Sequence, residues 1–123
     1  GYELTPDFIS KTKQMAEVIE TIHLYQEPKE AAEKANIVYT DTWVSMGQEA
    51  EAETRKKAFS GFQINSELLK VAKEDVKVMH CLPAHRGEEI TDEIIDGTHS
   101  IVYDQAENRL HVEKALLKLL LRK

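Results

Sequence analysis

The sequence predicts an α/β fold in which helices flank a parallel, doubly wound, Rossmann-like sheet, and two observations lead to this prediction. Short β-branched runs, such as residues 37–40 and 76–80, alternate with segments in which apolar residues recur at helical spacing. Strand, helix and strand within so few residues form a parallel crossover. A chain of 123 residues is long enough for one hydrophobic core but too short for two, so residues 1–123 are expected to form a single domain.

The first part of the chain predicts a helix, a strand and a second helix. Thr5 can cap the first helix and Pro6 suits its first helical position, and apolar spacing carries this helix to about residue 20. The short apolar run at residues 22–25 is typical of a strand. The alanine-rich, charged residues 29–35 predict a small helix.

The middle of the chain predicts a strand, a long loop and two helices. The β-branched residues 37–40 are too few for a helix and predict a strand. Periodicity fails over residues 41–53, so we expect a loop here, either functional or merely solvated, that leads into a helix over residues 52–59. Asn65 is then expected to cap a helix over residues 67–72.

The last third of the chain predicts two more strands around a short helix. Residues 76–80 form the more apolar of these strands, and Thr91 is expected to cap a helix over residues 92–96 that Gly97 ends. Residues 101–103 predict the last strand.

The predicted strand ends bring polar residues to one edge of the sheet. Asp41, Cys81 and Asp104 each follow a predicted strand, and Asp104 also forms a capping-box pattern with Glu107 that opens a terminal helix. Ligands of parallel sheets bind beyond the carboxyl ends of the strands. The sequence therefore predicts a site for a small polar molecule at this edge.

Composition narrows the class of protein. The chain is 41% hydrophobic and 31% charged, which is typical of a soluble globular domain, and its net charge of −6 opposes non-specific binding to nucleic acid or to anionic membranes. One cysteine excludes an internal disulfide, and no apolar stretch approaches the ~20 residues that cross a bilayer. With no secretory signal either, we expect a cytoplasmic location, and a chain that begins without methionine is expected to be a processed product or a piece of something longer.

The residue types around Cys81 leave several chemistries to weigh. On residue type alone, Cys81 could be a small core residue at a strand end or a functional thiol. Neighbouring strand residues point to opposite faces, so His80 is poorly placed to deprotonate Cys81, which argues against a cysteine hydrolase. His80, Cys81 and His85 match no common zinc spacing, and the scattered glycines form no phosphate-binding loop.

Three motifs carry a resemblance to a known family. Residues 41–47 read Asp-Thr-Trp-Val-Ser-Met-Gly, residues 80–83 read His-Cys-Leu-Pro, and residues 104–109 read Asp-Gln-Ala-Glu-Asn-Arg. These closely resemble signatures of ornithine carbamoyltransferases, and the resemblance covers nearly the whole chain. Aspartate carbamoyltransferases would show His-Pro-Leu-Pro at residues 80–83, and putrescine carbamoyltransferases lack the Ser-Met-Gly loop.

The resemblance implies an activity and its setting. Members of the family transfer a carbamoyl group from carbamoyl phosphate to L-ornithine, which gives L-citrulline and phosphate, and they use no metal or other cofactor. For this chain the resemblance implies a role in arginine biosynthesis, a cytoplasmic location and a homo-oligomer, expected to be a homotrimer.

The resemblance also implies roles for individual residues. Asp41 would hold the α-ammonium group of ornithine, helped by Ser45 and the backbone at Met46, through a charge-assisted hydrogen bond worth roughly 1.5–3 kcal/mol. The other three roles belong to the later motifs.

In those motifs, Cys81 would be the polar, weakly acidic neighbour of the reacting δ-amine, and the backbone carbonyl of Leu82 would accept the amino group of carbamoyl phosphate. Arg109 would stabilise negative charge that builds up in the tetrahedral step. Without the motif context, Arg109 would instead be a surface residue paired with Glu107 or Glu113.

Half of the family's active site has no counterpart in these residues. The carbamoyl-phosphate domain, with its Ser-Thr-Arg-Thr loop and its His-Pro-x-Gln motif, is missing, and so is the asparagine that binds the ornithine carboxylate. We therefore expect the chain to be the later part of an ornithine-binding domain and to be inactive alone. The alternatives are a non-catalytic amino-acid-binding or interaction module and a carbamoyltransferase for a related amine.

The resemblance implies a gap in the sheet as well. In a doubly wound domain of strand order 3-2-1-4-5-6, the strands predicted here would be the third to the sixth. The two central strands would then be absent between residues 22–25 and 37–40. We expect that residues 22–25 pair directly with residues 37–40 or that another copy fills the gap, while the last three strands remain contiguous.

Overall fold

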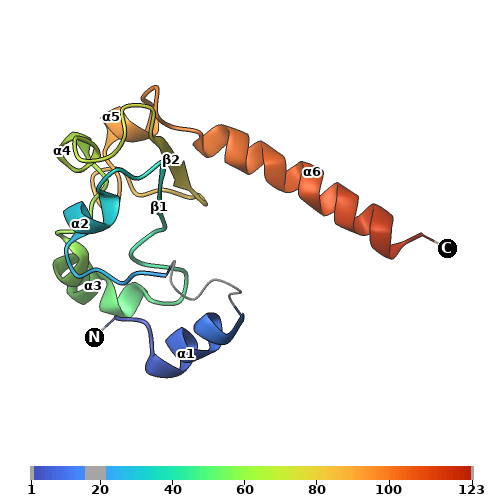
Figure 1. Ribbon diagram of the computed structural model, residues 1–123, viewed down its shortest axis with the longest axis horizontal. Helices are drawn as coiled ribbons and strands as arrows, with labels where there is room; N and C mark the ends of the chain where they lie inside the picture. The colour runs from blue at the N-terminus through green and yellow to red at the C-terminus, as the bar shows by residue number, and fades with distance from the viewer. Residues whose placement is uncertain (1, 16–21, 123) are drawn as a thin grey trace.

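The computed structural model describes residues 2–15 and 22–122 and has the predicted α/β arrangement, with short helices around a small parallel sheet (Figure 1). In chain order the elements are α1 (Pro6–Met15), α2 (Pro28–Ala32), β1 (Ile37–Thr40), the 3-10 turn η2 (Glu49–Glu51), α3 (Ala52–Phe59), α4 (Ser66–Leu69), β2 (Lys77–His80), α5 (Asp92–Ile95) and α6 (Val102–Leu120).

β2 is the strand of the two-stranded sheet that has a neighbouring segment on each side. It pairs in parallel with β1 in a register that places Ile37 beside Lys77 and Thr40 beside His80. On its other side, the carbonyl of Val78 accepts a hydrogen bond from the Ile101 N–H at 3.0 Å, which forms a single parallel bridge with Ser100. β1, β2 and the segment that begins at Ser100 therefore lie side by side in this order, as predicted for the last three strand segments.

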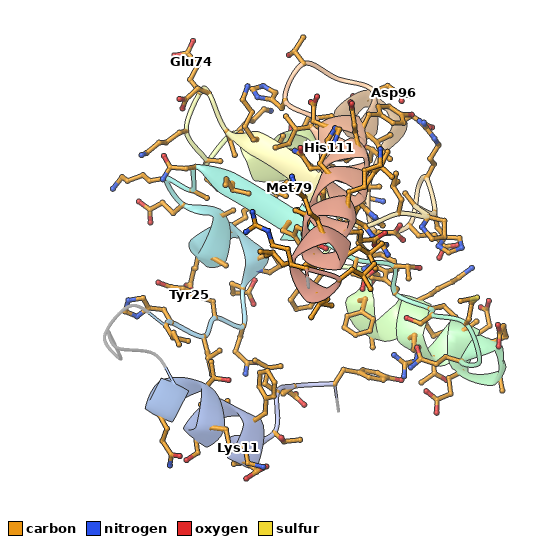
Figure 2. All side chains as sticks on the ribbon, turned by 90° about the vertical axis from the view of Figure 1, so that its right-hand side faces the viewer. Lys11, Tyr25, Glu74, Met79, Asp96 and His111 are labelled. Carbon is orange, nitrogen blue, oxygen red and sulfur yellow. The ribbon has the colours of Figure 1, made fainter. Side chains whose placement is uncertain are left out.

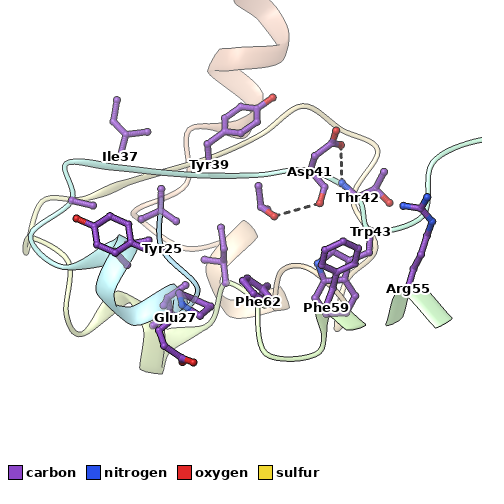
Figure 3. A pocket seen from close by; sticks show the side chains of 18 of the residues that line it. Tyr25, Glu27, Ile37, Tyr39, Asp41, Thr42, Trp43, Arg55, Phe59 and Phe62 are labelled. Atoms are coloured by element: carbon purple, nitrogen blue, oxygen red, sulfur yellow. Dashed lines mark hydrogen bonds between the residues drawn. The ribbon is translucent and has the colours of Figure 1, made fainter. Parts of the chain in front are cut away.

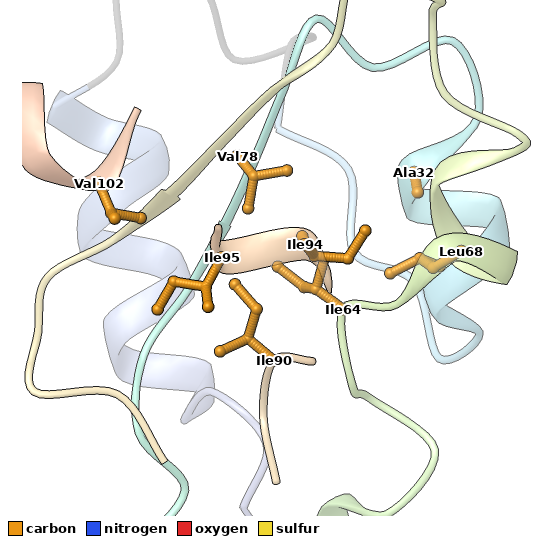
Figure 4. Close-up of a cluster of buried hydrophobic side chains, with 8 residues drawn as sticks. All are labelled: Ala32, Ile64, Leu68, Val78, Ile90, Ile94, Ile95 and Val102. Carbon is orange, nitrogen blue, oxygen red and sulfur yellow. The ribbon is translucent and has the colours of Figure 1, made fainter. Parts of the chain in front are cut away.

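The hydrophobic core lies where α4 and α5 cover the inner face of β2 (Figure 4). Val78 lies on this face, and Val102, the first residue of α6, completes the cluster. The buried side chains are Ala32, Ile64, Leu68, Val78, Ile90, Ile94, Ile95 and Val102. Their burial fixes which residues of β2 face inward and which face the opposite side.

Two of the predicted helix caps make their side-chain hydrogen bonds, and a third residue lies at the predicted position without one. The Thr5 hydroxyl accepts a hydrogen bond from the Phe8 N–H at 3.2 Å, and the Asn65 side chain accepts one from the Leu68 N–H at 3.0 Å. Thr91 occupies the N-cap position of α5, but its side chain makes no capping hydrogen bond. α2, α4 and α5 end earlier than predicted, α3 has the predicted bounds, and the expected continuation of α1 falls on residues 16–21, outside the described part of the chain.

Two predicted strands are not strands. Residues 22–25 enter no ladder, because the described residues supply no neighbouring strand for them. Residues 101–103 form no strand: the single bridge beside β2 belongs to Ser100, and the chain enters α6 at Val102, whose side chain is fully buried. Asp104 consequently lies in the first turn of α6, and the capping-box prediction there is wrong because Ile101 occupies the N-cap position.

α6 leads away from the rest of the molecule (Figure 1), and Figure 2 shows this helix foreshortened, with its C-terminal end toward the viewer. Its first turn contacts β2, but from residue 106 to residue 122 every side chain is exposed, including Leu120 at 79%. None of the helices within residues 2–15 and 22–122 combines the length and the apolar character needed to cross a membrane.

The outer edge of β1 faces a cavity. Within the described ranges, β1 pairs only with β2, and the side chains of Ile37 and Tyr39 are 57% and 54% exposed. Tyr25 lines the same cavity without forming a strand, so the direct pairing that was expected to close the gap does not occur in this part of the chain.

Candidate functional site

The loops that follow β1 and β2 meet at the carboxyl edge of the sheet. The Cys81 thiol donates a hydrogen bond to Asp41 Oδ1 at 2.8 Å, and the Thr42 N–H donates to the same oxygen at 2.7 Å. The sequence therefore placed Asp41 and Cys81 correctly at one edge. Asp104, the third residue expected there, lies on α6 instead.

The alternation of strand residues brings the two groups together. Ile37, Tyr39 and Asp41 point to the same side of the sheet (Figure 3). The register of β1 with β2 places Cys81, the residue after β2, beside Asp41 on that side. Burial, together with the hydrogen bond to Asp41 and the charge of that carboxylate, raises the pKa of the Cys81 thiol. The thiol is therefore protonated near neutral pH and acts as the donor of the pair.

Tyr39 belongs to the same face. Burial raises the pKa of the Tyr39 phenol, and its interactions with the Cys81 thiol and the Asp41 charge raise this pKa further, whereas a hydrogen bond with Gln105 lowers it. A neutral phenol, a neutral thiol and a carboxylate thus form one polar group beside the strand ends.

His80 faces the opposite way, into the core, as its adjacency to Cys81 predicts. Its Nε2 lies 2.9 Å from Glu89 Oε1, and its Nδ1 accepts a hydrogen bond from the Leu82 N–H at 2.8 Å. Because Nδ1 accepts, the proton of the neutral ring is on Nε2 and is donated to Glu89. Both side chains are completely buried.

Glu89 is a residue that the sequence did not indicate. It belongs to the charged run at residues 86–89, which is typical of a solvated surface, and only its position directly before the buried Ile90 hinted at a change of environment. In the structure its carboxyl group holds both His80 and the backbone of His85. Glu89 therefore supports the turn that carries Cys81 and Leu82.

Leu82 lies in this turn with an unusual backbone. Its φ is 56°, and the Leu82–Pro83 peptide bond is cis. The Leu82 side chain packs against the core while its N–H is bound to His80. These contacts fix the peptide groups that follow Cys81.

The loop after Asp41 is held by its own hydrogen bonds. The Ser45 N–H donates to Gln48 Oε1 at 3.2 Å, and the Gln48 N–H donates to the Ser45 carbonyl at 3.0 Å. Met46, between them, is 98% exposed. Gly47 adopts a φ of +85°, which side chains rarely allow, and this permits the tight turn.

A cavity of about 590 Å³ runs along the edge of β1 and ends at this loop (Figure 3). Asp41, Thr42 and Ser45 line its polar end together with Arg55. Its other walls are mainly apolar and aromatic, with Phe59 stacked on the Trp43 ring at 6.3 Å. The cavity can therefore hold a molecule that has both charged and aliphatic parts.

Arg109 lies apart from this group. It is on the exposed part of α6, and its guanidinium Nη2 lies 3.4 Å from Glu113 Oε1, the surface pairing that its residue type allowed. Gln105, from the same motif, does reach the sheet: its side chain accepts a hydrogen bond from the His80 N–H at 3.1 Å. The structure thus brings together the two loops that carry Asp41, Ser45, Cys81 and Leu82. Arg109 remains paired with Glu113 on the exposed part of α6.

No metal site is formed by the side chains of residues 2–15 and 22–122. The residues with ligand chemistry near the turn already have other partners, since His80 binds Glu89 and His85 Nδ1 lies 2.8 Å from the Thr42 hydroxyl. This arrangement is suited to hydrogen bonding of a polar ligand.

Relatives of the chain carry one name. The chain is 56% identical over all 123 residues to an ornithine carbamoyltransferase from Archaeoglobus fulgidus and 52% identical over 122 residues to an anabolic ornithine carbamoyltransferase from Pyrococcus furiosus. In each case it spans 39% of the relative's length. The chain therefore corresponds to well under half of these proteins.

Solved structures show the same relationship. An anabolic ornithine carbamoyltransferase from Campylobacter jejuni matches 97% of the chain with a TM-score of 0.88 and 40% identity, over 40% of its own length. An N-acetyl-L-ornithine transcarbamylase matches 98% of the chain with a TM-score of 0.78 and 27% identity, over 37% of its length. The fold is thus shared between enzymes named for two related amines.

A family model covers nearly all of the sequence. The model is described as aspartate/ornithine carbamoyltransferase, Asp/Orn binding domain, and it matches residues 1–120. The match includes both loops that form the Asp41 and Cys81 pair. The chain belongs to the aspartate/ornithine carbamoyltransferase family, within its Asp/Orn-binding domain.

Proposed function

We propose that this chain is the ornithine-binding part of an ornithine carbamoyltransferase, which converts carbamoyl phosphate and L-ornithine to L-citrulline and phosphate. The observation that carries the proposal is the hydrogen bond from the Cys81 thiol to Asp41, which lines the polar end of the cavity. The names of the relatives support the same assignment.

Asp41 and the loop after it would bind the amino-acid end of the substrate. Its carboxylate is the partner that an α-ammonium group needs, and Ser45 with the backbone at Met46 would add hydrogen bonds from the same loop. A charge-assisted contact of this kind contributes roughly 1.5–3 kcal/mol, so it orients ornithine but does not hold it alone.

Cys81 and Leu82 would act at the reacting end. The δ-amine must lose its proton before its lone pair attacks the carbamoyl carbon, and the neutral, partly buried thiol of Cys81 provides a polar but uncharged neighbour. Once the new C–N bond has formed, the tetrahedral intermediate collapses: the C–O bond to phosphate breaks, phosphate leaves with the electron pair, and the proton that the attacking nitrogen loses goes to phosphate. The Leu82 carbonyl would accept the amino group of carbamoyl phosphate.

Arg109 would stabilise the negative charge of the tetrahedral step and of the leaving phosphate. To do so it would have to exchange Glu113 for the substrate, which the exposure of both side chains permits. The reaction as written needs no cofactor.

The rest of the site would come from outside these residues. Because the chain spans about 39% of its relatives, we propose that a carbamoyl-phosphate domain completes the site and that the 123-residue chain alone is inactive. The assembled protein would be a homo-oligomer, with the homotrimer as the expected form. It would work in the cytoplasm, in arginine biosynthesis. An anabolic relative from Pyrococcus furiosus supports the biosynthetic direction.

Two alternatives remain distinct in their chemistry. A carbamoyltransferase for a related amine is supported by the likeness to an N-acetyl-L-ornithine transcarbamylase, whose name implies a blocked α-amino group. Asp41 distinguishes the two because a free α-ammonium group needs this carboxylate. A non-catalytic amino-acid-binding or interaction module would use the cavity without any transfer.

Citrulline formation tests the proposal. The full-length protein that contains this chain should form citrulline from ornithine and carbamoyl phosphate, and Asp41→Asn should raise the KM for ornithine about tenfold or more through loss of the charged contact. Asp75→Asn, at an exposed site, is the matched control. A full-length protein that carbamoylates N-acetyl-ornithine in preference to ornithine, or neither, would contradict the proposal.

A further inference from the structure

We propose that His85 is a positioning residue that fixes the loop carrying Asp41 and Ser45 to the turn carrying Cys81. The contact behind this inference joins His85 Nδ1 to the Thr42 hydroxyl at 2.8 Å, across 43 positions of the sequence. Its role in substrate binding rests on the proposed function, but the physical link between the two loops does not.

The hydrogen bonds of Thr42 determine which group donates. The Thr42 hydroxyl has one proton and lies 3.2 Å from the Val44 carbonyl, which can only accept. With that proton given to Val44, the hydroxyl oxygen accepts from His85, so His85 has its proton on Nδ1. The direction of donation is thus from His85 through Thr42 to the backbone of the loop.

Glu89 supports the same assignment from the buried side. Its Oε2 lies 3.9 Å from His85 Nδ1, and within the described ranges this buried oxygen has no hydrogen-bond partner. A carboxylate oxygen in this position favours a proton on the nearer imidazole nitrogen.

The backbone of His85 is anchored as firmly as its ring. The His85 N–H donates to Glu89 Oε1 at 2.6 Å, and the same oxygen accepts from His80. Because Glu89 and His80 are completely buried, this anchor belongs to the core. The His85 ring therefore extends from a fixed support toward a loop that is itself largely exposed.

The link continues from Thr42 to the site. The Thr42 N–H donates to Asp41 Oδ1, and that oxygen also accepts the hydrogen bond of the Cys81 thiol. A closed circuit of hydrogen bonds thus runs from the turn through His85 and Thr42 to Asp41 and back to Cys81. Loss of the His85 donor opens this circuit at one point and leaves, within residues 2–15 and 22–122, the Asp41–Cys81 hydrogen bond as the remaining link of this kind between the loop and the turn.

Two substitutions of His85 separate its Nδ1 donor from its bulk. The side-chain nitrogen of asparagine is as many bonds from the backbone as imidazole Nδ1, whereas that of glutamine corresponds to Nε2. His85→Asn should therefore retain the link and His85→Gln should lose it. Thr42→Val removes the acceptor from the other loop, and Thr42→Ser retains it.

Trp43 reports on the loop directly, because it follows Thr42 and is the only tryptophan of the chain. Loss of one hydrogen bond should raise the population of the open loop by about 2- to 10-fold. Acrylamide quenching of Trp43 fluorescence in the 123-residue chain should therefore be stronger in His85→Gln and Thr42→Val than in the parent sequence. His85→Asn and Thr42→Ser should remain close to the parent sequence. Equal quenching in His85→Asn and His85→Gln, or in Thr42→Val and Thr42→Ser, would overturn the inference.

Steady-state kinetics of the full-length protein then test the role in substrate binding. His85→Gln should raise the KM for ornithine by about 2- to 10-fold while the KM for carbamoyl phosphate changes little, and His85→Asn should restore it. Equal changes in both KM values would refute a positioning role for this loop. An inactive parent protein would refute the proposed function, whereas the quenching result would still decide whether His85 holds the loop.

Discussion

The Cys81 thiol donates a hydrogen bond to the Asp41 carboxylate at 2.8 Å, so the ends of two neighbouring strands share one negative charge. Because the thiol is partly buried and faces that charge, its pKa lies above the ordinary range. The reactivity of the only cysteine of the chain therefore depends on a residue 40 positions earlier.

Thiol reactivity should follow this dependence. At pH 7.5, roughly a unit below the ordinary pKa of a thiol, alkylation of Cys81 in the native chain should be slower than in urea, since only the thiolate reacts. Asp41→Asn removes the opposing charge and should accelerate native alkylation severalfold. Fast alkylation of the parent sequence with no change in Asp41→Asn would show that Asp41 does not control the thiol.

Removal of one partner of the buried His80 and Glu89 pair should strongly destabilise the domain. His80→Ala leaves the buried Glu89 carboxyl group without its side-chain donor and should lower the free energy of unfolding by roughly 3–5 kcal/mol. Urea denaturation measures this loss. His111→Ala, at an exposed histidine paired with Glu107, is the control and should change stability by about 0.5 kcal/mol or less. Similar effects of the two substitutions would mean that the buried pair is not formed.

Core packing gives a contrast between two apolar residues. Ile90 is completely buried, and Ile90→Ala should cost about 2–5 kcal/mol of unfolding free energy. Leu120, which α6 leaves exposed, should tolerate alanine with a change of about 0.5 kcal/mol or less. Thermal or urea unfolding of the isolated chain compares them, and a large loss in Leu120→Ala would show that α6 packs back on the domain.

Acid should weaken the contact between Arg86 and α5. Hydrogen bonds from the Arg86 guanidinium lower the pKa of Asp96, so the folded state binds this proton less readily than the unfolded state. The stabilisation is therefore present above the ordinary pKa of aspartate and is lost as the pH falls through the lowered value. Arg86→Gln should flatten this part of the stability curve between about pH 5 and pH 2, and an unchanged curve would rule out the contribution.

The edge of β1 should promote self-association of the 123-residue chain. Unpaired strand edges pair with other chains, and within the described ranges β1 has a partner on one side only. Light scattering should show a mass that increases with concentration, and Ile37→Lys should reduce this increase because a charge opposes edge pairing. Leu120→Lys is the control for the exposed face of α6. A monomer at all concentrations, or a reduction only in the control, would exclude edge pairing.

Local signals in the sequence were sufficient for much of the fold and for the centre of the site. The caps at Thr5 and Asn65 depend on side chains within three residues, and the placement of Asp41 and Cys81 follows from where two β-branched runs end. These features need no knowledge of distant contacts, so they could be predicted.

The wrong predictions concern segments whose conformation depends on partners. Residues 22–25 have a strand-like composition but no adjacent strand in the described residues, and at residues 101–103 the start of α6 replaces the predicted strand and leaves a single bridge at Ser100. Glu89 escaped prediction because its burial is decided by His80, nine positions earlier, and no local pattern marks it. Charge and periodicity report only on neighbours in the sequence. The conformation or burial of these residues depends instead on contacts with residues that are distant in the sequence.

The alternation of β2 also limits which insertions and deletions the gene can tolerate. His80 reaches Glu89 in the core, and Cys81 reaches Asp41 at the outer face, only because successive strand residues point in opposite directions. One codon gained or lost within β2 would exchange the two side chains, which would put the thiol beside Glu89 and the imidazole beside Asp41. Insertions and deletions should therefore be tolerated in the loops on either side of β2 rather than within the strand.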